Sequence, residues 1–138
     1  MRSGSADPGP LFWGCCMRAL IIEDQFLIAT QIEDVLRDMG YSEFDFVDDE
    51  ESAVRAARAN CPDLITVDER LIAGSGMSAV AEVCAQHGDI PTLYITEFRN
   101  KVRSALPDAI IVGKPFGSRL LKEAVAQAVL NRKVADGV

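Results

Sequence analysis

Five residues suited to phosphoryl chemistry follow short apolar runs in this chain. They are Glu23, Asp24, Asp68, Thr96 and Lys114. A divalent cation such as Mg²⁺ takes carboxylate ligands, so Asp24 and Asp68 could supply two of them, and Glu23 could reach the ion through a coordinated water. An aspartate beside such a cation can also form an aspartyl-phosphate. An ammonium group and a hydroxyl would then compensate charge on the transferred oxygens.

Each of these residues also has an ordinary structural interpretation when it is taken alone. An acid after a strand is often a helix N-cap, so Asp24 could merely cap the next helix. Thr96 could be a strand or cap residue, and Lys114 could be a solvated charge before Pro115. Only their joint placement at one edge of a sheet would favour the chemical interpretation.

Apolar runs alternate with amphipathic segments from Met17 onward, and this alternation predicts the fold. Strands are expected near residues 19–22, 43–47, 64–67, 90–95 and 108–112. Helices are expected near residues 26–39, 49–59, 77–84, 98–106 and 118–131. Five such repeats favour an α/β three-layer sandwich, (βα)5, with a parallel five-stranded sheet covered on both faces. Ligands of these sheets bind beyond the carboxyl ends of the strands, where the five residues would lie.

The composition favours a soluble protein and excludes several classes. With 138 residues the chain fits one domain, and its formal net charge of −7 argues against nucleic-acid binding, which needs Lys and Arg on phosphates. No apolar stretch reaches the roughly 20 residues that membrane insertion needs. The cysteines have no zinc-binding spacing and favour free thiols in the cytoplasm, and His87 is expected on the surface at a helix end.

The first residues differ from the rest of the chain. Residues 1–16 are rich in Gly, Ser and Pro and lack periodicity, so we interpret them as a cloning remnant or a disordered leader. The alternative is a docking segment around Trp13. We expect one domain over residues 17–134, followed by a tail over residues 135–138.

From about Met17 to Arg132, the sequence resembles the receiver domains of two-component signalling. The resemblance rests on strand context, order and spacing of Glu23-Asp24, Asp68, Gly76, Thr96 and Lys114-Pro115-Phe116. It implies a flavodoxin-like fold with strand order 2-1-3-4-5. It also implies that the aspartate after the third strand accepts a phosphoryl group from a sensor histidine kinase or a histidine phosphotransfer protein.

The resemblance assigns further roles at the site. It implies Mg²⁺ as cofactor, held by Asp24, Asp68 and the backbone carbonyl of Arg70. The threonine hydroxyl and the lysine ammonium would contact the phosphoryl oxygens. The Lys114–Pro115 peptide bond is expected to be cis.

Several positions depart from the family pattern, and two of them bear on function. The aromatic residue that commonly lies three positions before the lysine is Ile111, which puts signal transmission by that ring in doubt. The residue after the threonine is usually small and is Glu97 here, so we expect this carboxylate to act as a gate to donors or water. Arg70 borders the same site and could pair with Glu97.

The leading interpretation is a single-domain response regulator. The chain ends about twenty residues after Phe116, so we expect no output domain. It would signal by protein contact, or serve as a phosphorelay shuttle or phosphate sink. Its binding face would involve the fourth helix, fifth strand and fifth helix, compatible with a monomer or a homodimer. We expect no enzymatic activity beyond Mg²⁺-dependent self-phosphorylation and autodephosphorylation.

Two other functions stay open. An aspartyl-phosphate-dependent phosphatase or phosphotransferase usually has a second acid two residues after the nucleophile, and Arg70 occupies that position. A receiver-like interaction domain that works without phosphorylation is the other. The complete set of five residues argues against it, whereas Ile111 and Glu97 favour it.

Overall fold

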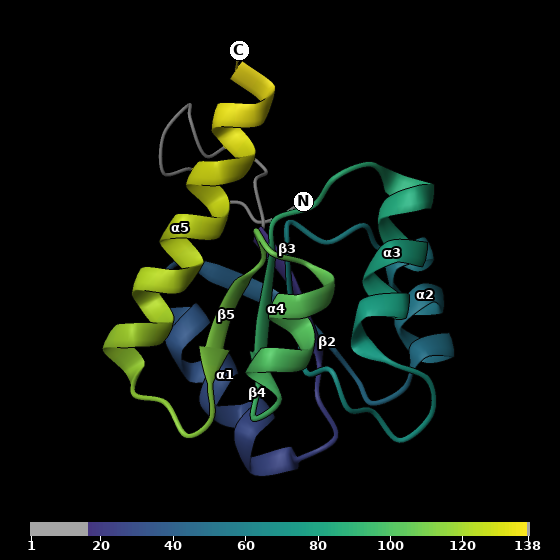
Figure 1. The fold of residues 1–138 in the computed structure, drawn as a ribbon. Coiled ribbons are helices and arrows are strands. Elements are labelled where there is room, and N and C mark those ends of the chain that lie inside the picture. The colour runs from purple at the N-terminus through teal and green to yellow at the C-terminus, as the bar shows by residue number, and fades with distance from the viewer. Residues whose placement is uncertain (1–16, 138) are drawn as a thin grey trace.

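The computed structural model describes residues 17–137, with side chains described to Arg132, and shows a parallel sheet between two layers of helices (Figure 1). The strands are β1 (Met17–Ile22), β2 (Tyr41–Val47), β3 (Leu64–Val67), β4 (Thr92–Thr96) and β5 (Ile110–Gly113). The helices are α1 (Phe26–Asp38), α2 (Glu50–Ala59), α3 (Gly76–His87), α4 (Arg99–Ala105) and α5 (Ser118–Gly137). The predicted alternation of strands and helices is confirmed. The predicted leader over residues 1–16 lies outside the described residues.

The order of the strands brings the ends of four of them together. The sheet runs β2-β1-β3-β4-β5 with every neighbouring pair parallel, which confirms the predicted order. Ile22 at the end of β1 pairs with Val67 at the end of β3, and Thr96 at the end of β4 pairs with Gly113. The residues that follow these strands therefore leave the sheet at one edge.

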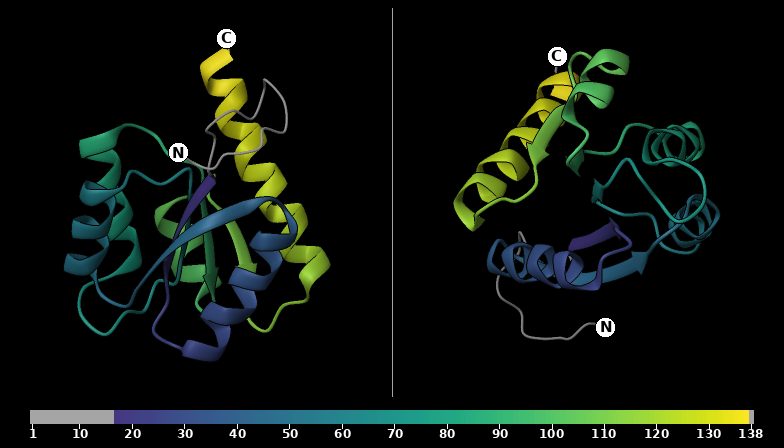
Figure 2. Two further views of the ribbon diagram at one scale, coloured as in Figure 1. Left: turned by 180° about the vertical axis from the view of Figure 1, so that it is seen from behind. Right: turned by 60° about the horizontal axis from the view of Figure 1, so that its bottom comes forward.

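Both faces of the sheet are covered, as the continuous apolar strands require. Alternate residues of β1 point to opposite faces. Ala19 and Ile21 pack in one core cluster with residues of α1 and α5, whereas Leu20 and Ile22 pack in a second cluster with α2, α3 and α4. Figure 2 shows α1 and α5 on one side of the sheet, with α2 and α3 on the other.

The helix starts decide one alternative left open by the sequence. The N-cap residue of α1 is Gln25, and no side chain caps this helix, so the interpretation of Asp24 as a mere cap is wrong. The start of α2, in contrast, is capped by Asp49, whose carboxylate accepts a hydrogen bond of 2.7 Å from Ser52 N.

Several elements extend beyond their predicted bounds, and β2 and α5 show why. β2 begins at Tyr41 instead of residue 43, because Tyr41 is buried and pairs with Met17 beside a register shift that interrupts the alternating pattern. α5 continues past residue 131 to Gly137, because Arg, Lys and Ala keep the helix going after the apolar spacing stops. None of the helices described between residues 17 and 137 combines the length and apolar character that crossing a membrane requires.

Candidate functional site

Three carboxylates gather at the carboxyl ends of β1 and β3. One oxygen from each of Glu23, Asp24 and Asp68 lies within 4.8 Å of the others. Glu23 and Asp68 are buried, whereas Asp24 is exposed. The predicted meeting of these acids at one edge of the sheet is therefore observed.

Lys114 joins this group from the end of β5. Its Nζ lies 2.9 Å from Oδ2 of Asp68 and 2.9 Å from Oε1 of Glu23. All three side chains are at most 7% exposed. The Lys114–Pro115 peptide bond is cis, as expected. Because removing one partner of a buried ion pair leaves an uncompensated charge, the lysine is a structural requirement of the carboxylate pair as well as a candidate phosphate contact.

The charges of this cluster do not cancel. Burial lowers the pKa of Lys114, but hydrogen bonds to Asp68 and Glu23 outweigh it and the net pKa is raised, which keeps the ammonium protonated. Burial raises the pKa of Glu23, Lys114 opposes this effect, and the charge of Asp68 adds to it, so the net direction is upward. One ammonium faces more than one carboxylate, which leaves excess negative charge at the site.

The donor set fits a hard divalent cation. All candidate ligands are oxygens, which Mg²⁺ prefers over nitrogen or sulfur. Oε1 of Glu23 is buried without a hydrogen bond although it lies close to the lysine ammonium, so it has unused capacity as an acceptor. The exposed carboxylate of Asp24 leaves one side of the cluster open to solvent. These residues can therefore hold Mg²⁺.

Thr96 lies at the end of β4, next to the lysine strand. Its side chain is fully buried, and its Oγ1 accepts a hydrogen bond of 2.9 Å from Phe98 N. The backbone N–H of Lys114 donates to the Thr96 carbonyl at 3.2 Å. A hydroxyl that accepts from the backbone still has its own hydrogen to donate, so Thr96 can contact an anionic oxygen at this edge.

The predicted pairing of Arg70 with Glu97 is wrong. The Arg70 guanidinium lies over the ring of Phe98, with Cζ 4.6 Å from the ring centroid. Within residues 17–132 no ion pair joins Arg70 to Glu97, which is exposed. A guanidinium stacks on an aromatic face with little loss of hydration, so the ring is the better partner at this solvent-exposed position. The Arg70 backbone N–H donates to Oδ1 of Asp68 at 3.3 Å, which places its peptide beside the carboxylate cluster.

Sequence reasoning missed Glu69, the residue after Asp68. Glu69 is 3% exposed, accepts a hydrogen bond from Met77 N and pairs with Lys101 of α4. The available signal was the run of three charged residues directly after a buried strand. Because successive residues of an extended segment point in opposite directions, one of the three had to point away from the site.

The thiols and the histidine lie apart from this cluster. Cys61 and Cys84 are free, as expected, and the other two cysteines lie outside the described residues. His87 ends α3 as predicted, but it is half-buried with an unpaired Nε2 instead of lying on the surface.

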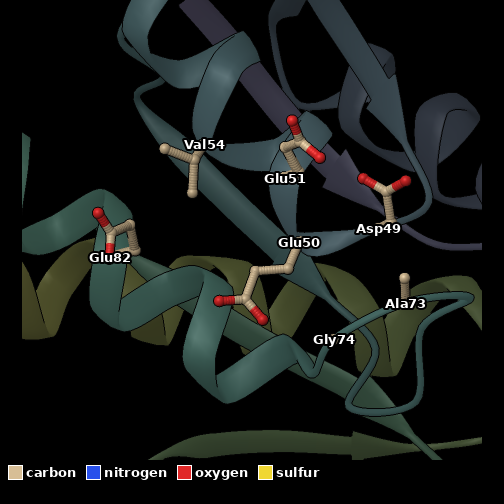
Figure 3. A pocket seen from close by; sticks show the side chains of 7 residues that line it. All are labelled: Asp49, Glu50, Glu51, Val54, Ala73, Gly74 and Glu82. Carbon is tan, nitrogen blue, oxygen red and sulfur yellow. The ribbon is translucent and has the colours of Figure 1, made fainter.

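A separate acidic hollow lies between α2 and α3 (Figure 3). Its volume is about 410 Å³, and it is lined by Asp49, Glu50, Glu51, Val54, Ala73, Gly74 and Glu82. Glu50 binds Ser75 N and Ser78 Oγ, and Asp49 caps α2. These carboxylates hold the backbone in place, so the hollow is a consequence of how α2 meets the loop after β3.

Comparison with known proteins agrees with the geometry. Residues 19–126 match the family model of the response regulator receiver domain. The transcriptional regulatory protein PdtaR of Mycobacterium tuberculosis is 31% identical over 117 residues, covering 81% of this chain and 56% of PdtaR. The phyllosphere-induced regulator PhyR of Methylorubrum extorquens is 28% identical over 120 residues, covering 84% of this chain and 45% of PhyR. The chain thus spans about half the length of the curated relatives it matches.

A solved receiver structure adds information on the metal. The receiver domain of a sensor histidine kinase from Pseudomonas aeruginosa has a TM-score of 0.71 and 28% identity, covering 83% of this chain and 98% of that one. That structure has a magnesium ion coordinated in its active-site cleft. With a family model that matches most of the chain and the strand order on which the fold depends, this chain belongs to the response regulator receiver domain family.

Proposed function

We propose that Asp68 of this receiver domain accepts a phosphoryl group from a sensor histidine kinase or a histidine phosphotransfer protein. The observation that carries the proposal is the Asp68 carboxylate, buried beside Lys114 and at the same sheet edge as Thr96. In the transfer, a carboxylate oxygen of Asp68 forms a bond to phosphorus while the phosphorus–nitrogen bond of the phosphohistidine breaks. The electron pair of the broken bond stays on the imidazole nitrogen, which takes up a proton from the solvent.

Each neighbouring residue has a defined task in this reaction. Lys114 supplies a fixed positive charge, and Thr96 supplies a hydroxyl donor, for the phosphoryl oxygens. Asp24 and Asp68 would hold Mg²⁺ together with the backbone carbonyl of Arg70, while Glu23 acts indirectly. The ion, when bound, neutralises charge on the phosphoryl oxygens.

The domain would act through protein contacts in the cytoplasm, or carry the phosphoryl group between proteins as a shuttle or sink. We propose the face of α4, β5 and α5 for these contacts, including a homodimer. We propose no reaction besides Mg²⁺-dependent self-phosphorylation and autodephosphorylation. Arg70 stands where a hydrolase of this kind would need a second acid, which argues against a dedicated phosphatase.

Intact-mass measurement tests the acceptor. With Mg²⁺ and acetyl phosphate, the chain should gain one acid-stable, base-labile phosphoryl group. Asp68→Asn should abolish the addition. Asp89 is an exposed aspartate before β4, at the opposite end of the strands, and Asp89→Asn should leave the addition intact. Chelation of Mg²⁺ should prevent it. An undiminished addition in Asp68→Asn would overturn the assignment.

Glu97 is proposed as a gate to the site. It is exposed directly after Thr96, so its charge opposes the approach of an anionic donor. Glu97→Ala should raise the phosphorylation rate with acetyl phosphate by roughly threefold and should change the lifetime of the aspartyl-phosphate. Glu123→Ala on α5 provides a control for loss of an exposed carboxylate. If the phosphorylation rate and the aspartyl-phosphate lifetime are the same in Glu97→Ala and Glu123→Ala, Glu97 is only a surface charge and not a gate.

A further inference from the structure

Glu69 is a buried carboxylate next to the acceptor that the proposed chemistry does not use. Its side chain is only 2% exposed. A carboxylate at this depth is costly unless hydrogen bonds and a counter-charge compensate it. The partners of its oxygens therefore indicate what the residue does.

Glu69 closes the loop that follows Asp68. Its backbone carbonyl accepts a hydrogen bond of 2.9 Å from Gly76 N, and its Oε1 accepts one of 2.9 Å from Met77 N. These bonds connect the start of the loop to the first turn of α3. Between them lie residues 70–75, which include the Arg70 carbonyl proposed above as a ligand of Mg²⁺. Glu69 thus fixes the backbone on which the acceptor site depends.

The other carboxylate oxygen of Glu69 reaches α4. Its Oε2 lies 3.5 Å from Nζ of Lys101, whose side chain is 64% exposed. Among the described residues of α4, Arg99–Ala105, only Val102 is buried, and no side chain caps the start of the helix. A short helix held by so little buried surface can shift when the contacts at its start change.

Two more contacts connect the same turn of α4 to the site. Phe98, the N-cap residue of α4, lies under the Arg70 guanidinium and donates its backbone N–H to Thr96 Oγ1. Phosphorylation would draw that hydroxyl toward the phosphoryl oxygens. None of these contacts involves Ile111, which packs in the core cluster of α2, α3 and α4.

We propose that Glu69 is a positioning residue that couples Asp68 to α4 through its ion pair with Lys101. The inference rests on the proposed phosphorylation of Asp68. A phosphoryl group on Asp68 rearranges the loop that Glu69 closes, the pair with Lys101 changes, and the first turn of α4 moves. Coupling between two sites is reciprocal. A partner protein that binds the Lys101 ammonium in place of Glu69 therefore changes the phosphorylation equilibrium of Asp68.

Hydrogen exchange of the full chain tests this coupling. Exchange of the α4 amides is compared before and after phosphorylation with Mg²⁺ and acetyl phosphate, and intact mass reports the phosphorylated fraction. In the unsubstituted chain the α4 amides should change their exchange rates by about tenfold. Lys101→Gln should lose most of this response while still being phosphorylated. Lys101→Arg, which keeps the charge, should retain it, and so should Lys122→Gln on α5.

A second variant addresses the carboxylate itself. Glu69→Gln keeps an oxygen that can accept from Met77 N but loses the charge that pairs with Lys101. It should lose the α4 response as Lys101→Gln does, and the double variant should lose no more than either one. If Lys101→Gln is phosphorylated and its α4 responds as in the unsubstituted chain, the proposed coupling is overturned, whereas the proposed phosphorylation of Asp68 stands. If the unsubstituted chain takes up no phosphoryl group, the proposed function is overturned and the coupling with it.

Discussion

The loop over residues 69–75, which follows the proposed acceptor, is held by different kinds of contact on its two sides. Toward α2 the contacts include hydrogen bonds between backbones. Ile72 N donates to Asp48 O at 3.1 Å, and Glu50 N donates to Ala73 O at 3.0 Å. The Glu50 carboxylate adds hydrogen bonds to Ser75 N and Ser78 Oγ. This side fixes the path of the loop.

Toward α4 the contacts of the loop, within residues 17–132, come from side chains. Glu69 pairs with Lys101 at 3.5 Å, and Arg70 stacks over Phe98 at 4.6 Å. The Lys101 ammonium is 64% exposed, and an ion pair with such a solvated partner typically contributes only about 0–1 kcal/mol to stability. Lost hydrogen bonds to a charged group cost about 1.5–3 kcal/mol. This difference in energy indicates that the loop is anchored to α2 and can change its contacts with α4. Movement is expected on the α4 side.

The largest effect should come from breaking the anchored side at Gly74. Its φ of +83° disfavours any side chain, and an added Cβ would lie 2.6 Å from Glu50 Cβ and still closer to its Oε1. Gly74→Ala should therefore lower the free energy of unfolding by about 3 kcal/mol, from backbone strain and overpacking together. Urea denaturation measures the loss.

Gly88→Ala is the matched control for this substitution. Gly88 has a similar φ of +86°, but nothing lies within 4 Å of an added Cβ. It should lose only about 2 kcal/mol, the cost of a side chain on a backbone with φ +86° and ψ 179°, which is adopted almost only by glycine. Equal losses in the two variants would show that the contact between the loop and Glu50 is not tight, and the contrast between the two sides of the loop would fail.

The sequence predicted the part of this molecule that depends on short-range patterns. Continuous apolar strands and amphipathic helices follow directly from residue spacing, and their alternation predicted a parallel sheet covered on both faces. The order of the strands came from the resemblance to receiver domains. Because parallel strands end at one edge, the meeting of Asp24, Asp68 and Lys114 also followed from the fold. These predictions needed no knowledge of any side-chain conformation.

The contacts of the loop could not be predicted in the same way. Whether Arg70 pairs with Glu97 or stacks on Phe98 depends on rotamers and loop path, which spacing does not determine. The burial of Glu69 depends on α3 and α4 meeting over one short loop, a long-range arrangement. The start of β2 was missed because a register shift interrupts its alternation.

A pair of truncations compares the two sides directly and should give a smaller effect. Glu50→Ala removes the acceptor of two hydrogen bonds on the α2 side and should cost about 1.5 kcal/mol in unfolding free energy. Lys101→Ala removes an ammonium that is 64% exposed, while Met77 N still donates to the buried Glu69 carboxylate, and should cost about 0.5 kcal/mol. Urea denaturation of both variants in one buffer makes the measurement. A loss in Lys101→Ala that equals or exceeds that in Glu50→Ala would contradict the weaker attachment toward α4.

The smallest effect near neutral pH concerns Tyr94 of β4, because its contribution appears only at alkaline pH. Burial raises the pKa of the Tyr94 hydroxyl, and the negative charge of Glu69 raises it further. In the unfolded chain this hydroxyl ionises near its ordinary pKa of 10.0. The unfolded state therefore loses its proton first, so stability is fully present below about pH 10 and falls as the pH rises further.

Tyr94→Phe should remove this contribution. Near neutral pH its unfolding free energy should match that of the unsubstituted chain within about 0.5 kcal/mol, because no hydrogen bond to the hydroxyl is described within residues 17–132. Above pH 10 its stability should fall less steeply, by up to about 1.4 kcal/mol per pH unit. Denaturation curves between pH 8 and pH 11 measure both slopes. Since the charge of Glu69 contributes to the raised pKa of Tyr94, Glu69→Gln should move the Tyr94 ionisation to lower pH. An unchanged ionisation would show that Glu69 has no effect on Tyr94.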